Sequence, residues 1–204
     1  MAQIGRNIEI AAALLSQGKV VAMPTDTVYG VACNALDEKA VEEIYRIKER
    51  SKDKPLIAQT YSLKKATSFL THVPIHAAKL AEKYWPGAIT MVLVANSNIP
   101  KSMISGGTTL GVRVPDHDMA LELLKSLPFP LAVTSANKSG MPSPKSAEEV
   151  DSQIGDRIDY ILDGGPSEIG IESTIVGFED EKPVILRAGA ISEEEIFKTL
   201  NIEK

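Results

Sequence analysis

Short apolar runs alternate with helix-like segments along most of the chain, and this alternation constrains the fold more than any other feature. Strands are predicted where apolar and β-branched residues cluster between turn residues, at 19–23, 30–33, 56–59, 89–95, 110–114, 131–134, 160–162, 173–178 and 184–187. Helices are predicted over 8–17, 38–48, 63–70, 75–85 and 119–127, and after Ser146 and Ser192, where Ser-x-x-Glu fits a capping box. The pattern predicts an α/β fold.

The connections between the last strands are of hairpin length, which argues against a purely parallel sheet and predicts a mixed, twisted one. The sequence shows no repeat, low-complexity tract or linker, so residues 1–204 are expected to form one domain. A chain of this length buries enough surface for a full hydrophobic core without covalent staples.

The composition excludes several classes of protein. A single cysteine, Cys33, excludes an internal disulfide framework and a cysteine-based zinc site, and we predict no metal site built from the protein's own residues. The longest apolar run, 89–95, is far too short to span a bilayer. The first residues lack the apolar core of a signal peptide, so we expect a cytoplasmic protein without membrane contact.

Positive charge is concentrated in one segment, although the whole chain has a formal net charge of −5. Five cations occupy every second position of this segment: Arg46, Lys48, Arg50, Lys52 and Lys54. In extended chain beyond the helix end, the last three would share one face and bind phosphate oxygens. The alternative is a solvated helix end, where cations complement the helix dipole. Because 165–170 has the glycine spacing of a phosphate loop but lacks its lysine, phosphates would need side-chain cations.

Polar residues interrupt apolar strands at 24–30, 111–115, 131–137 and 184–189. Arg113 and Arg187 lie on otherwise apolar strands, and a buried arginine needs an anion because an unpaired buried charge is costly. Ligand crevices of α/β sheets lie at strand ends, so these segments are candidates for a binding site. Turn formation and internal ion pairs are the structural alternatives.

These segments also resemble a known family. The chain resembles the YrdC/TsaC family of threonylcarbamoyl-AMP synthases, in its single-domain branch, through Pro24-Thr-Asp-Thr-Val-Tyr-Gly30, Lys48-x-Arg50, Trp85-Pro-Gly87, Val112-Arg-Val-Pro115, Ser135-x-Asn137, Pro142-Ser-Pro144, Ser173-Thr-Ile-Val176 and Leu186-Arg-Ala-Gly189. The resemblance implies an open, twisted mixed sheet with flanking helices around a deep, positively lined groove.

The resemblance further implies a nucleotidyltransferase that forms L-threonylcarbamoyl-adenylate and pyrophosphate from L-threonine, bicarbonate and ATP, for the threonylcarbamoyladenosine modification of tRNA. Mg²⁺ would arrive with ATP. Downstream threonylcarbamoyl-transfer proteins, and weak contact with tRNA, are the implied partners. Carried over by position, ATP would be held by Lys48, Arg50, Lys54, Thr109, Ser135, Asn137, Ser143 and Arg187, with Lys48 and Arg50 catalytic. Threonine would be held by Thr27, Gln59, Arg113, Ser173 and the backbone at Val133.

The sequence departs from the family pattern at three places. Lys54 stands where many members have an asparagine, although the single-domain bacterial branch also has a lysine there. Gln59 stands where many members have a histidine that contacts substrate, and Ser51 replaces the usual proline after Lys-x-Arg. Two rival functions therefore stay open: an RNA-binding module, and a paralogue that has lost or changed the reaction. Gly106-Gly107 is expected to form a loop, with a lid over the groove as a second interpretation.

Overall fold

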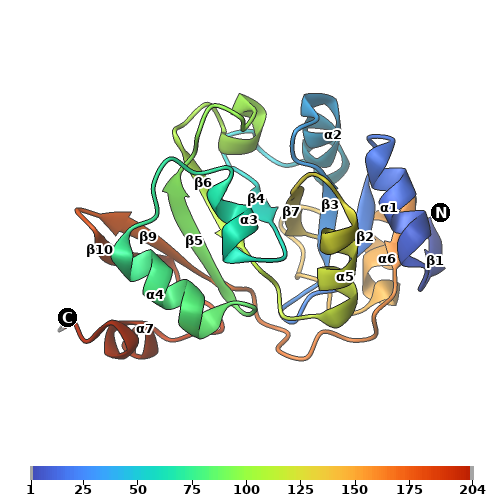
Figure 1. The fold of residues 1–204 in the computed structure, drawn as a ribbon. Helices are drawn as coiled ribbons and strands as arrows, with labels where there is room; N and C mark the ends of the chain where they lie inside the picture. Colours follow the sequence, from blue (N-terminus) through green and yellow to red (C-terminus); the bar gives the residue numbers. More distant parts are fainter. Residues whose placement is uncertain (1, 203–204) are drawn as a thin grey trace.

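The structure, a computed structural model, describes residues 2–202 and contains one ten-stranded sheet flanked by helices (Figure 1). The strands are β1 (Gln3–Gly5), β2 (Val21–Met23), β3 (Gly30–Asn34), β4 (Ile57–Gln59), β5 (Ile89–Val94), β6 (Thr109–Arg113), β7 (Leu131–Ser135), β8 (Tyr160–Leu162), β9 (Thr174–Glu179) and β10 (Lys182–Arg187). The α-helices are α1 (Ile8–Ser16), α2 (Glu38–Lys48), α3 (Leu63–Thr67), α4 (Ile75–Tyr84), α5 (Asp118–Ser126), α6 (Ala147–Ile154) and α7 (Glu193–Leu200).

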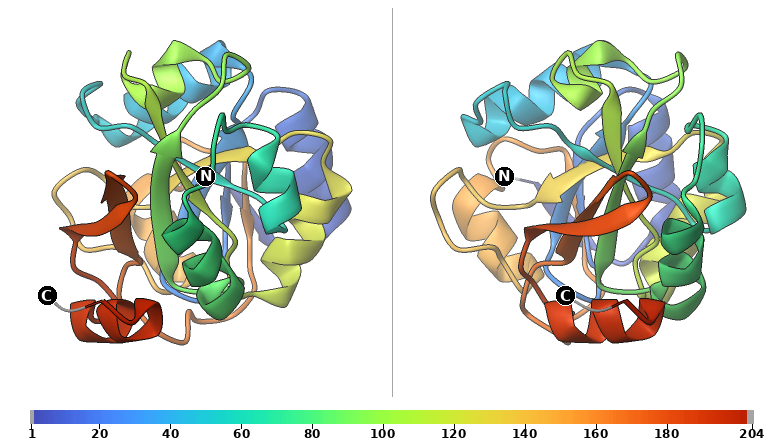
Figure 2. Two further views of the ribbon diagram at one scale, coloured as in Figure 1. Left: turned by 60° about the vertical axis from the view of Figure 1, so that its left-hand side comes forward. Right: turned by 90° about the vertical axis from the view of Figure 1, so that its left-hand side faces the viewer.

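The sheet is mixed, as predicted. Its strand order is β1-β8-β2-β3-β7-β4-β6-β5-β9-β10. Four of the neighbouring pairs, β1/β8, β2/β8, β4/β6 and β5/β9, are parallel, and the others are antiparallel. Figure 2 shows how strongly the sheet twists between its two edges. The predicted fold class is confirmed.

Strand residues alternate between two apolar layers, because successive side chains of a strand point to opposite faces. On one face, Val21 and Met23 of β2 pack with Leu15 of α1 and Leu123 of α5. On the other face, Ala22 belongs to the larger core that also takes in residues of α2, α4, α6 and α7. Figure 1 shows α1 and α5 together in front of the strands around β2.

Two elements escaped the sequence prediction. β1 is exposed at Gln3 and Ile4, so its three residues carry no apolar run that could signal a strand. The 3₁₀-helix η1, Lys101–Ile104, follows Pro100 and is held by a few turn hydrogen bonds, among them Met103 N–H to Pro100 O. Elements this short are fixed by their neighbours rather than by their own pattern.

Side-chain caps mark where α1, α2, α3, α6 and α7 begin, whereas α4 and α5 start without one. The Asp37 carboxylate accepts hydrogen bonds from the backbone N–H groups of Lys39 and Ala40, and α2 ends at Glu49 in the left-handed conformation (φ 53°). The predicted capping box at Ser192 is confirmed. The one predicted at Ser146 is only half formed: the Ser146 hydroxyl accepts from the N–H of Glu149, but the Glu149 carboxylate accepts from the N–H of Lys145, one residue before the cap.

None of the helices within residues 2–202 combines the length and the apolarity that crossing a membrane would require.

Candidate active site

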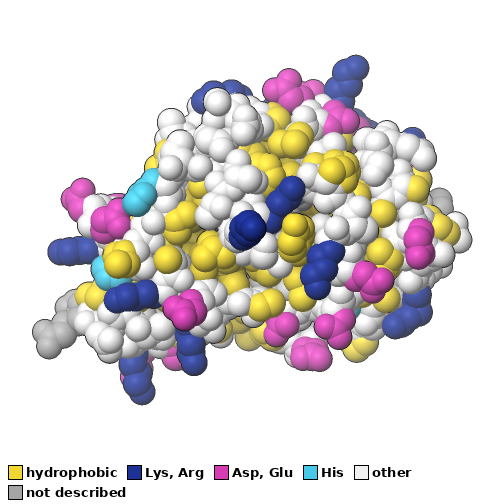
Figure 3. Space-filling view, viewed as in Figure 1, with side chains coloured by type: hydrophobic (Ala, Val, Ile, Leu, Met, Phe, Trp, Pro, Cys, Tyr) yellow, Lys and Arg dark blue, Asp and Glu magenta, His cyan; other side chains and the backbone are white. Residues whose placement is uncertain are grey.

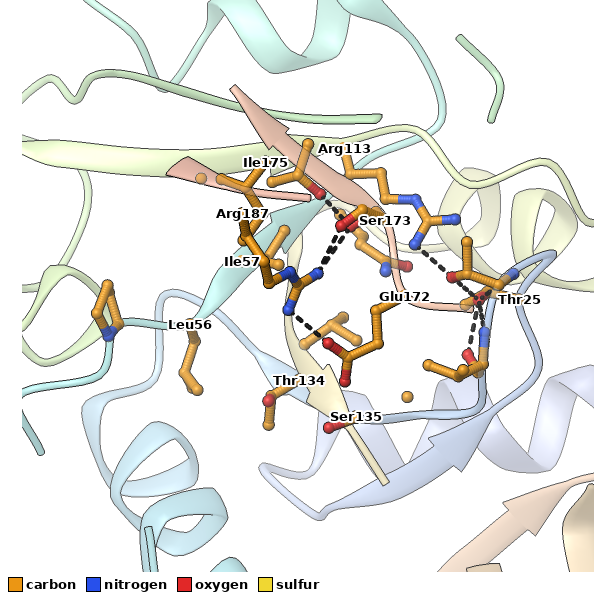
Figure 4. Close-up of a pocket in the computed structure, with 18 of the residues that line it drawn as sticks. Thr25, Leu56, Ile57, Arg113, Thr134, Ser135, Glu172, Ser173, Ile175 and Arg187 are labelled. Atoms are coloured by element: carbon orange, nitrogen blue, oxygen red, sulfur yellow. Dashed lines mark hydrogen bonds and ion pairs between the residues drawn. The ribbon is translucent and has the colours of Figure 1, made fainter. Parts of the chain in front are cut away.

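A cavity of about 500 Å³ lies over the central strands of the sheet (Figure 4). Its floor is a row of neighbouring strand residues, Val133 of β7, Ile57 of β4, Gly111 of β6 and Val92 of β5. Ile57 is in register with both Val133 and Gly111, and Gly111 with Val92. The floor is therefore apolar, and the polar side chains come from strand ends and loops around it.

One end of the cavity is built around a buried ion pair. The side chains of Arg113 and Asp26 are only 5% and 6% exposed, and Arg113 Nη2 lies 2.5 Å from Asp26 Oδ1. Arg113 also donates to Thr27 Oγ1 (2.7 Å) and to the carbonyl oxygen of Gly87 (2.9 Å). Burial lowers the pKa of Arg113, while the charge of Asp26 opposes this shift. Arg113 thus has its anion inside the protein, and its remaining N–H groups are available to a ligand.

Small hydroxyl groups surround this ion pair. Thr25 Oγ1 bonds Thr27 Oγ1 (3.0 Å), and Thr90 Oγ1 bonds Ser173 Oγ (2.8 Å). Gln59, 4% exposed, also lines the cavity, and its Oε1 is buried without a hydrogen-bond partner in the described chain. A buried amide oxygen without a partner is costly, so this end suits a ligand that donates hydrogen bonds as well as accepting them.

The other end carries cations. Arg50, Lys54 and Arg187 line the cavity. Arg50 reaches across its own loop and donates to the carbonyl oxygens of Lys54 and Pro55, both at 3.1 Å. Arg187 Nη2 donates to the carbonyl oxygen of Ser173 (2.7 Å). These three side chains give the cavity the charge that phosphate oxygens require.

The prediction that Arg50, Lys52 and Lys54 share one face is wrong for Lys52, although Arg50 and Lys54 both line the cavity. The chain after α2 forms turns rather than an extended strand, so the side chain between these two points elsewhere. Lys52 is directed toward Glu42, 3.4 Å away, and does not line the cavity over the sheet. Arg46 pairs on the surface with Glu43, three residues earlier in the helix.

Lys48 and Asn137 lie beneath the wall of the cavity rather than on it. The Lys48 ammonium, on a residue 1% exposed, donates to Ser135 O and Asn137 O (2.5 Å each) and to Asn137 Oδ1 (3.0 Å). Asn137 Oδ1 also accepts from the Ser135 hydroxyl (2.5 Å). Burial lowers the pKa of Lys48 to about 7, helped by the charge of Arg50 and opposed by Glu172. Through these three hydrogen bonds, Lys48 fixes the turn that presents Ser135 to the cavity.

Sequence reasoning missed the acidic residue of the site. Glu172 lines the cavity, with Oε1 accepting from the Ser143 hydroxyl (2.6 Å) and Oε2 paired with Arg187 Nη1 (2.7 Å). Figure 4 shows its carboxylate projecting between Arg187 and the side of Thr134 and Ser135. A Cβ at Gly189 would collide with the backbone of residues 172–174, so glycine permits this close approach. The Glu that precedes Ser-Thr-Ile-Val was the available signal.

The predicted site residues are thus largely brought together. Ten of them line the cavity: Thr27, Arg50, Lys54, Gln59, Thr109, Arg113, Val133, Ser135, Ser173 and Arg187. Lys48, Asn137 and Ser143 do not line it, but each bonds to a residue that does. Gly106 and Gly107 follow η1, and Gly106 lines a separate small cavity with Tyr45 and Ser102. Neither glycine lines the cavity over the sheet, and a lid formed by this loop stays a prediction.

Residues 13–189 match the family model for Sua5/YciO/YrdC, which is described as telomere recombination. The chain belongs to this family. It is 42% identical to the threonylcarbamoyl-AMP synthase of Pyrococcus abyssi, with 95% of this chain and 57% of the relative aligned. It is also 42% identical to the enzyme of that name from Bacillus subtilis, with 91% of this chain and 54% of the relative aligned. The chain therefore spans a little over half the length of these two relatives.

The fold matches a solved member of the family closely. A crystal structure of P. abyssi Sua5 complexed with L-threonine superimposes with a TM-score of 0.93 at 40% identity, covering 98% of this chain and 61% of that one. This agreement extends over the Sua5/YciO/YrdC family domain, including the strands that carry the cavity.

Proposed function

We propose that the protein is an L-threonylcarbamoyladenylate synthase, which forms threonylcarbamoyl-AMP and pyrophosphate from L-threonine, bicarbonate and ATP. The observation that carries the proposal is the two-ended cavity. Cations at one end suit a triphosphate, and an arginine with small hydroxyls at the other end suits an amino acid that bears a hydroxyl. Relatives named threonylcarbamoyl-AMP synthase, and the structure of P. abyssi Sua5 complexed with L-threonine, support the assignment.

The residues suit the steps of this reaction. Arg50, Lys54 and Arg187 would offset charge that develops on the α-phosphate and the leaving pyrophosphate. Arg113 would donate to the threonine carboxylate, and Thr27 and Ser173 would pair with its hydroxyl. A site that pairs with a substrate hydroxyl can reject an analogue without one by ~10⁴-fold. The apolar floor would keep water from the carbamate, whose oxygen attacks the α-phosphorus.

Mg²⁺ would enter with the nucleotide. Within residues 2–202, no group of three or more His, Cys, Asp or Glu side chains is arranged to hold a metal ion. The cavity presents one carboxylate, that of Glu172, which is already paired with Arg187. We therefore propose that the phosphates supply most of the ligands, and that Mg²⁺ neutralises part of the phosphate charge.

The proposed reaction also implies protein and tRNA partners. The product is an activated acyl-adenylate, so a protein that transfers the threonylcarbamoyl group to tRNA must consume it. Figure 3 shows the face that carries α3, α4 and α5, where basic side chains stand among apolar ones and acidic side chains lie toward the margin. This face presents no continuous basic track, so it favours at most a weak contact with tRNA.

The proposed function is tested by pyrophosphate release. The protein is incubated with ATP, Mg²⁺, bicarbonate and L-threonine, and each component is omitted in turn. We expect release only when all are present. Release that is independent of threonine and bicarbonate would contradict the synthase and favour the paralogue with a changed reaction. RNA binding that weakens steeply with salt, together with no release, would favour the RNA-binding module.

Arg50→Ala should weaken ATP binding by at least tenfold, because it removes a cation from the phosphate end of the cavity. Its structural cost should be small, since its two acceptors are backbone carbonyls of the exposed segment Lys54-Pro55. The comparison is Lys52→Ala, which removes an equal charge two residues away that faces Glu42. Calorimetric titration with ATP measures the affinity. A lowered Tm with unchanged ATP affinity would show that Arg50 only supports the loop.

A further inference from the structure

The carboxylate of Glu172 is unexpected in a cavity that we propose binds a polyphosphate. It is the one acidic residue among those lining the cavity in the described chain, and Arg50, Lys54, Arg113 and Arg187 are the cations. A carboxylate that faces phosphate oxygens would repel them. Its position therefore calls for a function of its own, and the cationic part of the substrates is the natural partner.

The contacts of Glu172 depend on groups that we assign to ATP. Its two oxygens are held by the Ser143 hydroxyl at 2.6 Å and by Arg187 Nη1 at 2.7 Å. Phosphate oxygens that bind Ser143 and Arg187 must compete with this carboxylate for the same donors. A carboxylate that loses its donors and gains an anionic neighbour takes up a proton more readily. ATP binding would thus convert a paired carboxylate into a proton acceptor.

The amino-acid end of the cavity begins at the next residue. Ser173 follows Glu172 in the chain, and Arg187 touches both, through Nη1 to the carboxylate and through Nη2 to the Ser173 carbonyl oxygen. Threonine carries an α-ammonium group at neutral pH, which has no lone pair for attack on carbon. The reaction therefore needs a proton acceptor beside the threonine end.

We propose that Glu172 is the catalytic base that deprotonates the α-ammonium group of threonine once ATP has engaged Ser143 and Arg187. The proposal rests on the proposed synthase function. An N–H bond of the ammonium breaks, its electron pair stays on nitrogen, and the proton passes to a carboxylate oxygen of Glu172. The neutral amine then forms the N–C bond with bicarbonate, and water leaves. The carbamate oxygen attacks the α-phosphorus, pyrophosphate leaves, and Glu172 releases its proton to solvent.

The charged groups that face Glu172 come from three elements. Arg187 stands on β10 and contacts it directly, Arg50 follows α2, and Lys48 lies at the end of α2. All three are cations. Lys48 has a pKa lowered to about 7 by burial, so its own titration contributes to any pH profile of the enzyme. A variant at position 172 keeps Lys48 intact, so a difference from the wild type is not due to Lys48.

The test is the pH dependence of kcat/KM for threonine in Glu172→Gln. Glutamine keeps the shape and the hydrogen bonds but cannot accept the proton. At pH 7 we expect a loss of about 10²–10⁴-fold, the usual size of a general-base contribution. As the pH rises from 7 toward the pKa of the threonine amine, the variant should regain activity relative to the wild type by about tenfold per pH unit, because only threonine that is already deprotonated reacts. ATP affinity should stay the same or increase, since Ser143 and Arg187 no longer face a carboxylate.

The matched control is Glu168→Gln, which removes the same charge from an exposed residue of the same loop and should leave activity unchanged. Equal activity of Glu172→Gln and wild type would overturn the base and leave the synthase standing. A loss that is constant with pH, or that comes with weaker ATP binding, would also overturn it and make Glu172 a positioning residue. Absence of threonine-dependent pyrophosphate release from the wild type would overturn both proposals.

Discussion

Arg113→Met should lower the free energy of unfolding by about 3–5 kcal/mol, the usual cost of breaking a buried ion pair from one side. Asp26 would be left as a buried carboxylate whose Oδ1 keeps only the N–H of Asp116 (3.1 Å) and whose Oδ2 has no partner among the described residues. Urea unfolding at pH 7 measures the loss. The same variant should bind threonine far more weakly, whereas its ATP affinity should change little.

The double variant Asp26→Asn/Arg113→Met separates the ion pair from the loss of packing. Asparagine keeps an acceptor for the Asp116 N–H but carries no charge, so the double variant should be more stable than Arg113→Met alone. The single variant Asp26→Asn completes the comparison. If the stability losses of Arg113→Met and Asp26→Asn simply add in the double variant, the Arg113–Asp26 contact contributes no coupling energy, and the arginine acts through packing alone.

Lys48→Met should reduce pyrophosphate release by at least tenfold, although Lys48 does not line the cavity. Methionine removes all three donors that hold Ser135 O, Asn137 O and Asn137 Oδ1, so the turn that carries the Ser135 hydroxyl loosens. A misplacement of about 1 Å at a reacting group can cost ~10²-fold in rate. Lys52→Met is the control, since that side chain is 73% exposed and pairs with Glu42 on the surface. Full activity of Lys48→Met would show that the turn holds itself.

The stability of the wild type relative to Lys48→Met should depend on pH. Burial lowers the pKa of Lys48 from 10.5 to about 7, so between these values the unfolded chain binds one more proton here than the folded chain. The wild type should therefore gain stability relative to Lys48→Met as pH rises through this window, by up to about 1.4 kcal/mol per pH unit. Guanidinium unfolding at pH 7.5 and 9.5 measures the difference. A difference that does not change with pH would contradict the lowered pKa.

Much of the fold was predictable because most of its strands have a clear sequence pattern. β5 and β7 are apolar runs between turn residues, and α2 has both a capping carboxylate at Asp37 and an apolar face. The strand order was not predictable, because β2 pairs with β8 across more than 130 residues. Local pattern fixes the faces of a strand, but the choice of partner belongs to the completed sheet.

The candidate site was likewise predictable only in part. The arginines on strands indicated buried anions, and for Arg113 the anion is Asp26, three residues before Tyr29 in a segment already singled out. The charge spacing of 46–54 misled for Lys52, because the chain turns after Glu49 and this side chain points toward Glu42 rather than into the cavity. Glu172 was signalled only by its place before Ser-Thr-Ile-Val, and by itself one glutamate beside a glycine-rich loop is typical of any surface segment.

The floor of the cavity has a consequence for how the protein is made. Its four positions lie side by side in the order 133, 57, 111 and 92, so no contiguous stretch of chain contains the surface. Arg187 arrives later still, on the edge strand β10. A sheet of such non-local pairings closes long loops before it gains contacts and folds slowly. During translation, nucleotide affinity should therefore appear in one step, after residue 187 has left the ribosome, rather than grow with chain length.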